Sequence, residues 1–183
     1  AYDSSNLLNI PSSRILPLSM ARDKILGFSG GFGKESGLDR TKYLLSQFAA
    51  NNVFRTGVHT VVTLVSNGDQ FSDVSAVPYD LTTLAPQKYN EIKAVVANTL
   101  GSMHFRFFSI VPHANICGGI KPTSGVYKKV SSMFYNDIPA NYKSGTVPGD
   151  SFDICTTSNF LAVFNSINNA IRPDLLQHLY GYW

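Results

Sequence analysis

Apolar residues recur at helical spacing in two segments of the first half of the chain. The first predicted helix has Asp39 as its N-cap and ends near Asn51. The second follows Thr83, carries Pro86 in its first turn, where proline is tolerated, and stops at Gly101. Its apolar face consists of Tyr89, Ile92, Val96 and Leu100. Both helices are therefore expected to bury one face against the rest of the fold.

Alternation of apolar and polar residues predicts strands between and after these helices. The clearest strand covers residues 53–66, and residues 103–111 form a second strong candidate. Weaker strand candidates are residues 71–77, 126–135 and 151–156. Helices and strands along one chain, with no internal boundary, indicate a single α+β domain over residues 1–183.

The C-terminal part of the chain carries the longest apolar stripe. A helix is predicted to start at Thr156, Thr157 or Ser158 and to run to about Ile171. Pro173 is expected to end it, because proline lacks the backbone N–H and clashes with the preceding turn. A separate short helix is then expected before residue 181. The apolar residues of the two helices are Phe160, Leu161, Phe164, Ile167, Ile171, Leu175, Leu176 and Leu179.

The sequence contains unusually few charged residues, and this indicates what kind of surface the protein has. Only 15% of the 183 residues are charged, against about 25% in an average soluble domain. A surface of small neutral polar groups is typical of extracellular proteins, of virion components and of proteins covered by copies of themselves. The net charge of +3 does not require a nucleic-acid partner. No apolar run approaches the roughly 18 residues of a transmembrane helix, so no membrane partner is expected.

Two cysteines, Cys117 and Cys155, leave two alternatives open. In a secreted or periplasmic protein they can form one disulfide, which would stabilise the fold by about 3–4 kcal/mol on the loop-entropy account. In a protein assembled in the cytoplasm they would remain free thiols, or Cys117 could later bridge to another chain. The sequence favours neither alternative.

No motif for catalysis, metal binding or cofactor binding is found. The glycine cluster before Lys34 lacks the spacing and the Ser or Thr that a phosphate-binding loop needs. A cysteine–histidine nucleophile assembled in space stays open, but neither cysteine has the sequence context of a nucleophile. None of the histidines has the spacing of a zinc site; they are His59, His104, His113 and His178. We therefore predict no catalytic residue, no metal ligand and no cofactor.

Cationic residues on the polar faces of the predicted strands are the one sign of a binding surface. Cations beside an aromatic residue, here Tyr127, can meet phosphates and stacked bases. An ordinary solvated sheet face would carry the same residue types. The candidate RNA contacts are Arg55, His59, His104, Arg106, Lys128 and Lys129.

Three consecutive segments close the chain: a strand within 150–157, a helix over 158–171 and a second helical segment over 173–180. This order resembles the coat proteins of the single-stranded RNA bacteriophages, in which a final strand runs into two helices. The resemblance implies an antiparallel sheet on which two C-terminal helices pack in an interlocked homodimer. It also implies a sheet face that binds RNA inside a shell. The residues implied to pack the dimer are Phe160, Phe164, Ile167, Leu176 and Leu179.

Two hypotheses of function follow. The first is a self-assembling virion coat protein that dimerises, forms a shell and contacts RNA. The second is a secreted or periplasmic binding module, or an enzyme of unfamiliar type, held by a Cys117–Cys155 disulfide. The location is a virion in the first case and extracellular or periplasmic in the second.

Overall fold

The structure is a computed structural model, and all the residues it describes belong to one compact unit, Glu35–Trp183. The structure describes residues 36–50, 60–66, 82–99, 105–113, 125–140, 143 and 148–180. It does not describe the side chains of residues 48, 99, 148 and 173–180. Residues 1–35 lie outside the described part, so a single domain over 1–183 stays a prediction.

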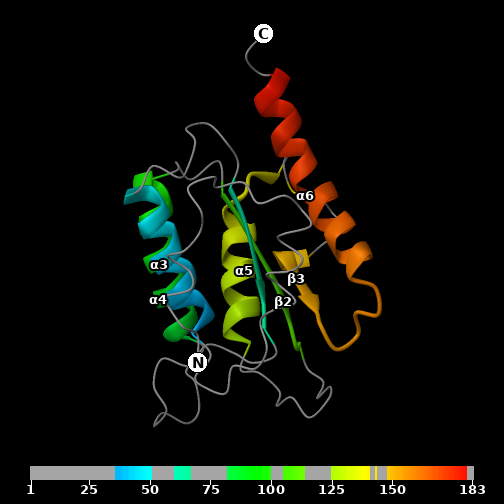
Figure 1. Cartoon of the computed structure of the whole chain (residues 1–183), viewed down its shortest axis with the longest axis horizontal. Coiled ribbons are helices and arrows are strands. Elements are labelled where there is room, and N and C mark those ends of the chain that lie inside the picture. Colours follow the sequence, from blue (N-terminus) through cyan, green and yellow to red (C-terminus); the bar gives the residue numbers. More distant parts are fainter. Residues whose placement is uncertain are drawn as a thin grey trace. The chain divides into compact units, whose positions relative to one another are not determined.

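Helices and strands alternate along the described chain (Figure 1). The helices are α3 (Gly37–Ala50), α4 (Leu84–Thr99), α5 (Val126–Asp137) and α6 (Phe160–Tyr180), with a short 3-10 turn, η3 (Pro148–Asp150). The strands are β1 (Thr60–Val65), β2 (Phe105–Val111) and β3 (Ser151–Asp153). The two predicted helices before residue 101 are confirmed. Helix α3 starts two residues before Asp39, so Asp39 lies in its first turn and is not its N-cap.

The three described strands form one sheet in the order β1-β2-β3, and both pairings are parallel. The predicted α+β fold with an antiparallel sheet is therefore wrong, and the fold is mixed α/β. Helix α4 lies between β1 and β2, and α5 lies between β2 and β3. Each helix carries the chain back to the edge where the previous strand began, so the next strand runs in the same direction. The register places Ser109 opposite Ser151.

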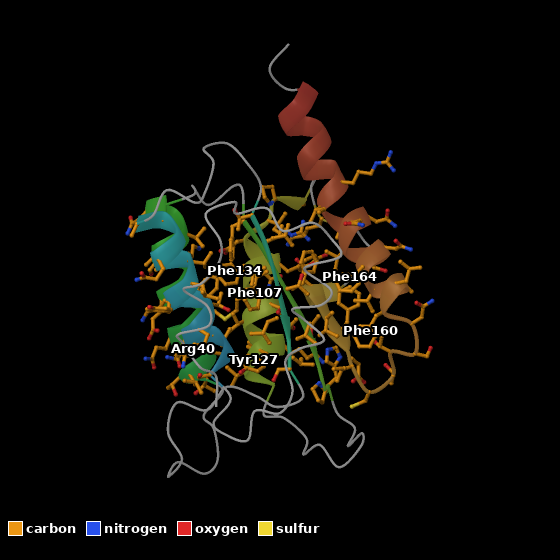
Figure 2. All side chains as sticks on the ribbon, in the orientation of Figure 1. Arg40, Phe107, Tyr127, Phe134, Phe160 and Phe164 are labelled. Atoms are coloured by element: carbon orange, nitrogen blue, oxygen red, sulfur yellow. The ribbon has the colours of Figure 1, made fainter. Side chains whose placement is uncertain are left out.

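Helices cover both faces of the sheet, and Figure 1 shows α6 on the side opposite to α3 and α4. Every residue of β2 is buried, as expected for a parallel strand between two helical layers. The core under α3, α4 and α5 includes Leu38, Leu45, Leu64, Tyr89, Ile92, Val96, Phe105, Phe107, Tyr127, Val130 and Phe134. The core under α6 consists of Phe108, Ile110, Val163, Ile167 and Ala170, with Val61, Phe152, Ile154 and Ile171 beside them. Figure 2 shows Phe107, Tyr127 and Phe134 in the first of these layers.

Residues 126–135 form helix α5, and the predicted strand there is wrong. Val126, Val130 and Phe134 are buried at intervals of four residues, which is a helical period. The β-branched and aromatic residues suggested a strand, but the spacing of the buried positions decides the structure. Gly125, with φ 82°, precedes the helix in a left-handed conformation that suits glycine.

Helix α6 is one continuous helix, so the prediction of two C-terminal helices is also wrong. Asn159 caps it, because its Oδ1 accepts hydrogen bonds from the backbone N–H groups of Leu161 (3.0 Å) and Ala162 (3.3 Å). Pro173 lies inside the helix. Proline removes a single intrahelical hydrogen bond, and the residues after it, rich in leucine, favour helix.

Strand β3 confirms residues 151–153 of the candidate at 151–156, β1 confirms residues 60–65 of the candidate at 53–66, and β2 confirms residues 105–111 of the candidate at 103–111. Residues 154–156 form a turn, so the end of the weak candidate is wrong. Residues 53–59, 71–77 and 103–104 lie outside the described residues, and the strand predictions there stay predictions.

Candidate functional site

Polar side chains gather where β2 and β3 end. His113 lies two residues beyond β2, and Asp153 is the last residue of β3. The carboxyl ends of parallel strands meet at one edge of the sheet, where open α/β folds bind their ligands. This carboxyl edge is therefore the first place to look for a site.

A chain of hydrogen bonds runs from His113 into the core. The distance from His113 Nε2 to Ser151 Oγ is 2.8 Å, and from Ser151 Oγ to Ser109 Oγ it is 2.9 Å. Ser109 Oγ lies 2.8 Å from Ser131 Oγ, which lies 3.1 Å from the carbonyl oxygen of Tyr127. We call Ser109, Ser131 and Ser151 the serine chain. Ser109 and Ser131 have no exposed surface, whereas His113 is half-buried at the open end.

The local folding of three elements builds this chain. In β2, Ser109 shares a face with Phe107, two residues before it, and this face packs on α5. In α5, Ser131 follows Tyr127 by four residues, so its hydroxyl reaches the Tyr127 carbonyl. In β3, Ser151 is paired with Ser109 by the register. Parallel pairing and the helical form of α5 are both required.

Asp153 holds the backbone of this edge together. Its Oδ1 accepts hydrogen bonds from the backbone N–H groups of His113 (3.3 Å) and Cys155 (3.0 Å). The carboxylate thus ties the end of β2 to the end of β3. Within the described part of the chain, no carboxylate is hydrogen-bonded to the His113 ring. Among the described residues, no third group orients the His113 ring as in a catalytic triad.

The electrostatics of the site keep His113 neutral. Burial lowers the pKa of the imidazole, and the Lys128 charge lowers it further. The Asp153 carboxylate opposes them, but the net pKa lies below the ordinary value of about 6.5. At neutral pH the ring therefore has one N–H and one free lone pair.

Cys155, two residues beyond β3, is disulfide-bonded. The only other cysteine in the sequence is Cys117, which lies outside the described residues. Cys117 follows His113 by four residues in the sequence, so the connections after β2 and β3 both carry a cysteine.

The predicted RNA contacts do not form one sheet face in the described residues. Arg106 is buried, and its guanidinium makes a two-pronged ion pair with Asp150, with contacts of 2.9, 3.0 and 3.1 Å. Its Nη1 also donates to the Ala170 carbonyl oxygen at 3.2 Å. Lys128 and Lys129 are exposed, but they lie on helix α5 and not on a strand. The remaining candidates, Arg55, His59 and His104, lie outside the described residues.

The predicted dimer-packing residues fall into three groups. Phe160 and Phe164 are 44% and 47% exposed on α6, and Leu161 beside them is 66% exposed (Figure 2). Ile167 is buried in the core of its own chain, against β2. The side chains of Leu176 and Leu179 lie outside the described part. Among the predicted dimer-packing residues whose side chains are described, Phe160 and Phe164 at the start of α6 are the exposed ones.

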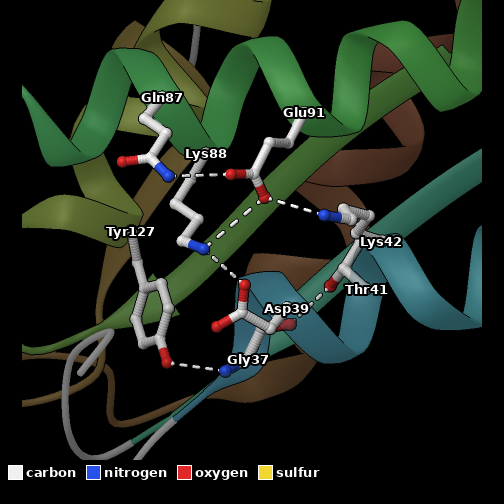
Figure 3. A network of polar contacts seen from close by, with 8 residues as sticks. All are labelled: Gly37, Asp39, Thr41, Lys42, Gln87, Lys88, Glu91 and Tyr127. Carbon is white, nitrogen blue, oxygen red and sulfur yellow. Dashed lines mark hydrogen bonds and ion pairs between the residues drawn. The ribbon is translucent and has the colours of Figure 1, made fainter. Parts of the chain in front are cut away.

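A second polar network joins α3 to α4 and is shown in Figure 3. Lys88 Nζ donates to Asp39 Oδ1 at 2.5 Å and to Glu91 Oε2 at 3.5 Å, and Lys42 Nζ reaches the same Glu91 oxygen at 3.0 Å. Burial lowers the pKa of Lys88, but Asp39 and Glu91 outweigh it and leave the pKa raised. Since its cations and carboxylates pair with one another, this network fixes the two helices and offers no free group for chemistry.

The close contact of α3 with α5 completes this network. The Gly37 backbone N–H donates to Tyr127 Oη at 3.0 Å. A Cβ at Gly37 would lie 2.7 Å from Leu64 Cδ1, so only glycine fits here without a shift.

No group of three or more His, Cys, Asp and Glu side chains that could hold a metal ion occurs among the described residues. The helices in the described ranges include none with the length and hydropathy of a membrane span. No known protein family, curated protein or solved structure matches the chain. The argument for function therefore rests on the carboxyl edge itself.

Sequence reasoning noticed His113 but missed the serine chain. One signal was present: Ser109 interrupts the apolar run of β2, and a serine in a buried strand needs a hydrogen-bond partner. The partners of Ser109 depend on which strands pair and in which direction. No local sequence pattern predicts that pairing.

Proposed function

We propose that this protein is an extracellular or periplasmic binding module whose ligand site is the carboxyl edge of the sheet around His113. The observation that carries the proposal is the disulfide at Cys155, directly beside the half-buried His113–Ser151 pair. Stable disulfides are typical of oxidising compartments. A disulfide beside a ligand site also limits the motion of the chain segments that form it.

The chain connections at this edge support the same proposal. The sequence between Val65, where β1 ends, and Leu84, where α4 begins, is longer than the usual connection of about 4–6 residues, and so is the sequence between Val111 and Val126. Long connections at the carboxyl edge of a rigid sheet are where binding residues concentrate. Binding is favoured over catalysis because no described carboxylate orients the His113 ring.

A second candidate function is the self-assembling coat protein. The observation in its favour is the exposed apolar group on α6, formed by Phe160, Leu161 and Phe164. Contact with RNA through a sheet face has less support, because β2 is buried along its whole length and Arg106 is paired with Asp150.

Size-exclusion chromatography with light scattering, followed by mass spectrometry without reductant, separates the two candidates. We expect a monomer or small oligomer without nucleic-acid absorbance, and a mass two hydrogens below that of the reduced chain. Large particles that contain nucleic acid, or free thiols on both cysteines, would overturn the binding-module proposal.

The location of the site is tested by an NMR screen of the ¹⁵N-labelled protein with pools of amino acids, monosaccharides and short peptides. We expect the shift changes to gather at residues 109–113 and 151–155. Changes confined to other surfaces, or none with any pool, would overturn the carboxyl edge as the ligand site.

A further inference from the structure

The direction of the hydrogen bonds in the serine chain carries an inference about the ligand, which rests on the proposed function. Each serine hydroxyl has a single hydrogen to donate. The three contacts between His113 Nε2 and Ser131 Oγ are 2.8–2.9 Å long, so each must contain one hydrogen. A serine oxygen can accept two hydrogen bonds, but a change of direction within the chain leaves one hydroxyl hydrogen without an acceptor there. The hydroxyls therefore all point the same way along the chain.

In the first direction, every hydrogen points away from His113 and toward the core, and each contact contains one hydrogen. His113 Nε2–H donates to Ser151, Ser151 donates to Ser109, and Ser109 donates to Ser131. The Ser131 hydrogen then points to the Tyr127 carbonyl oxygen, which accepts it at 3.1 Å. This direction makes four hydrogen bonds.

In the opposite direction, Ser131 donates to Ser109, Ser109 to Ser151, and Ser151 to a bare His113 Nε2. The Ser131 hydroxyl then donates nothing to the Tyr127 carbonyl oxygen, and the side chains of the chain make three hydrogen bonds. One buried hydrogen bond fewer shifts the equilibrium by about fivefold. The carbonyl at the inner end thus sets the direction of the whole chain.

We infer that neutral His113 carries its hydrogen on Nε2 and presents Nδ1 as a hydrogen-bond acceptor at the carboxyl edge, so that the ligand group bound there is an N–H or O–H donor. Among the described residues none is hydrogen-bonded to Nδ1. The charged groups that act on the ring are Lys128 of α5 and Asp153 of β3. The same direction leaves no lone pair on Nε2 to accept the Ser151 proton, which agrees with binding and not with a serine nucleophile.

Long-range ¹H–¹⁵N NMR of the imidazole at pH 7.5 tests the direction of the chain. In the native protein we expect the hydrogen on Nε2. In Ser131→Ala the Tyr127 acceptor no longer sets the direction, so the tautomer ratio should move toward Nδ1–H by about fivefold. Ser109→Ala interrupts the chain at another position and should have the same effect. Ser132→Ala, the same change one residue along α5, should leave the ratio unchanged. A native Nδ1–H tautomer, or no movement in either chain variant, overturns the inference.

Acetamide and acetate test the class of ligand, because they have the same shape and only acetamide is an N–H donor. At pH 7.5 we expect acetamide to shift the His113 resonances more than equimolar acetate does. An equal or larger response to acetate, or none to either, overturns the ligand class. These outcomes are separate from failure of the proposed function, which would appear as nucleic-acid particles or as ligand shifts at another surface.

Discussion

Two polar clusters connect β2 to β3, one on each face of the sheet. On the face covered by α6, Arg106 and Asp150 form a buried ion pair. On the face covered by α5, the serine chain forms an uncharged chain of hydrogen bonds that reaches His113 beyond the end of β2. In the first cluster the Arg106 guanidinium is bound inside the protein, by the Asp150 carboxylate and the Ala170 carbonyl oxygen. The second ends in a half-buried imidazole at the edge of the sheet.

The difference between the clusters indicates which one stabilises the fold and which one is available for binding. A buried charge needs its partner, so loss of one member of an ion pair leaves an expensive unpaired charge. A neutral chain loses two hydrogen bonds of about 1 kcal/mol each when one hydroxyl is removed. Changes at the Arg106–Asp150 pair should therefore affect stability most, and changes at the serine chain should affect His113 most.

Asp150→Asn is expected to have the largest effect. The change leaves Arg106 buried without its counter-charge and should lower the free energy of unfolding by about 3–5 kcal/mol. Asparagine tolerates the positive φ of 53° at this position, so the effect reports the lost charge. Urea unfolding followed by circular dichroism measures it.

The control for this prediction is a double-mutant cycle with Arg106→Met. The double variant should lose much less stability than the sum of the two single losses, because the two residues act as a pair. Additive losses would show that the ion pair is not the origin of the effect.

Cys155→Ser is expected to have the next largest effect. Removal of the disulfide should lower the free energy of unfolding by about 2–4 kcal/mol, through the greater freedom of the unfolded chain. The matched control is reductant, which should destabilise the native protein and leave Cys155→Ser unaffected. A native protein that is indifferent to reductant would contradict a structural disulfide at this edge.

Ser131→Ala is expected to cost about 2 kcal/mol, because the Ser131 hydroxyl makes two hydrogen bonds, one with Ser109 and one with the Tyr127 carbonyl oxygen. Ser132→Ala on the same helix should change stability by less than about 0.5 kcal/mol. Equal losses of stability in the two variants would show that the Ser131 hydroxyl contributes no more than an ordinary helix position. That result would contradict a stabilising role of the serine chain. Thermal or urea unfolding of both variants decides this.

The smallest expected effect is a fall in stability on acidification below the ordinary histidine pKa of about 6.5. The folded protein lowers the pKa of His113, so the unfolded state binds more protons below the ordinary value of about 6.5. Stability is complete above that pH and falls as the pH drops through the folded pKa. His113→Asn should flatten this slope. Glu91, whose pKa is also lowered, acts only in a more acidic range.

The sequence predicts local structure well where one apolar face repeats. Tyr89, Ile92 and Val96 mark α4 correctly because a helix that packs on one side shows its period directly. The fold class was missed because strand direction depends on how the chain returns between strands. Residues 105–111 contained a usable signal, since a nearly continuous apolar run is typical of a parallel strand buried on both faces.

The candidate site was harder to predict than the fold. Ser109, Ser131 and Ser151 are far apart in the sequence, and none stands in a motif. Ser109 and Ser151 meet through strand register, and Ser131 joins them only because residues 126–137 are helical. Pro173 shows that a local pattern can also mislead. Proline predicts the end of a helix at this position, but α6 continues through it.

Neutron diffraction from deuterated crystals at neutral pH tests the central claim most directly, because it places the hydrogens of the serine chain. We predict deuterium on His113 Nε2, directed at Ser151, and the Ser131 hydroxyl directed at the Tyr127 carbonyl oxygen. Deuterium on Nδ1 with a bare Nε2, together with a Ser131 hydroxyl directed at Ser109, would contradict the claim.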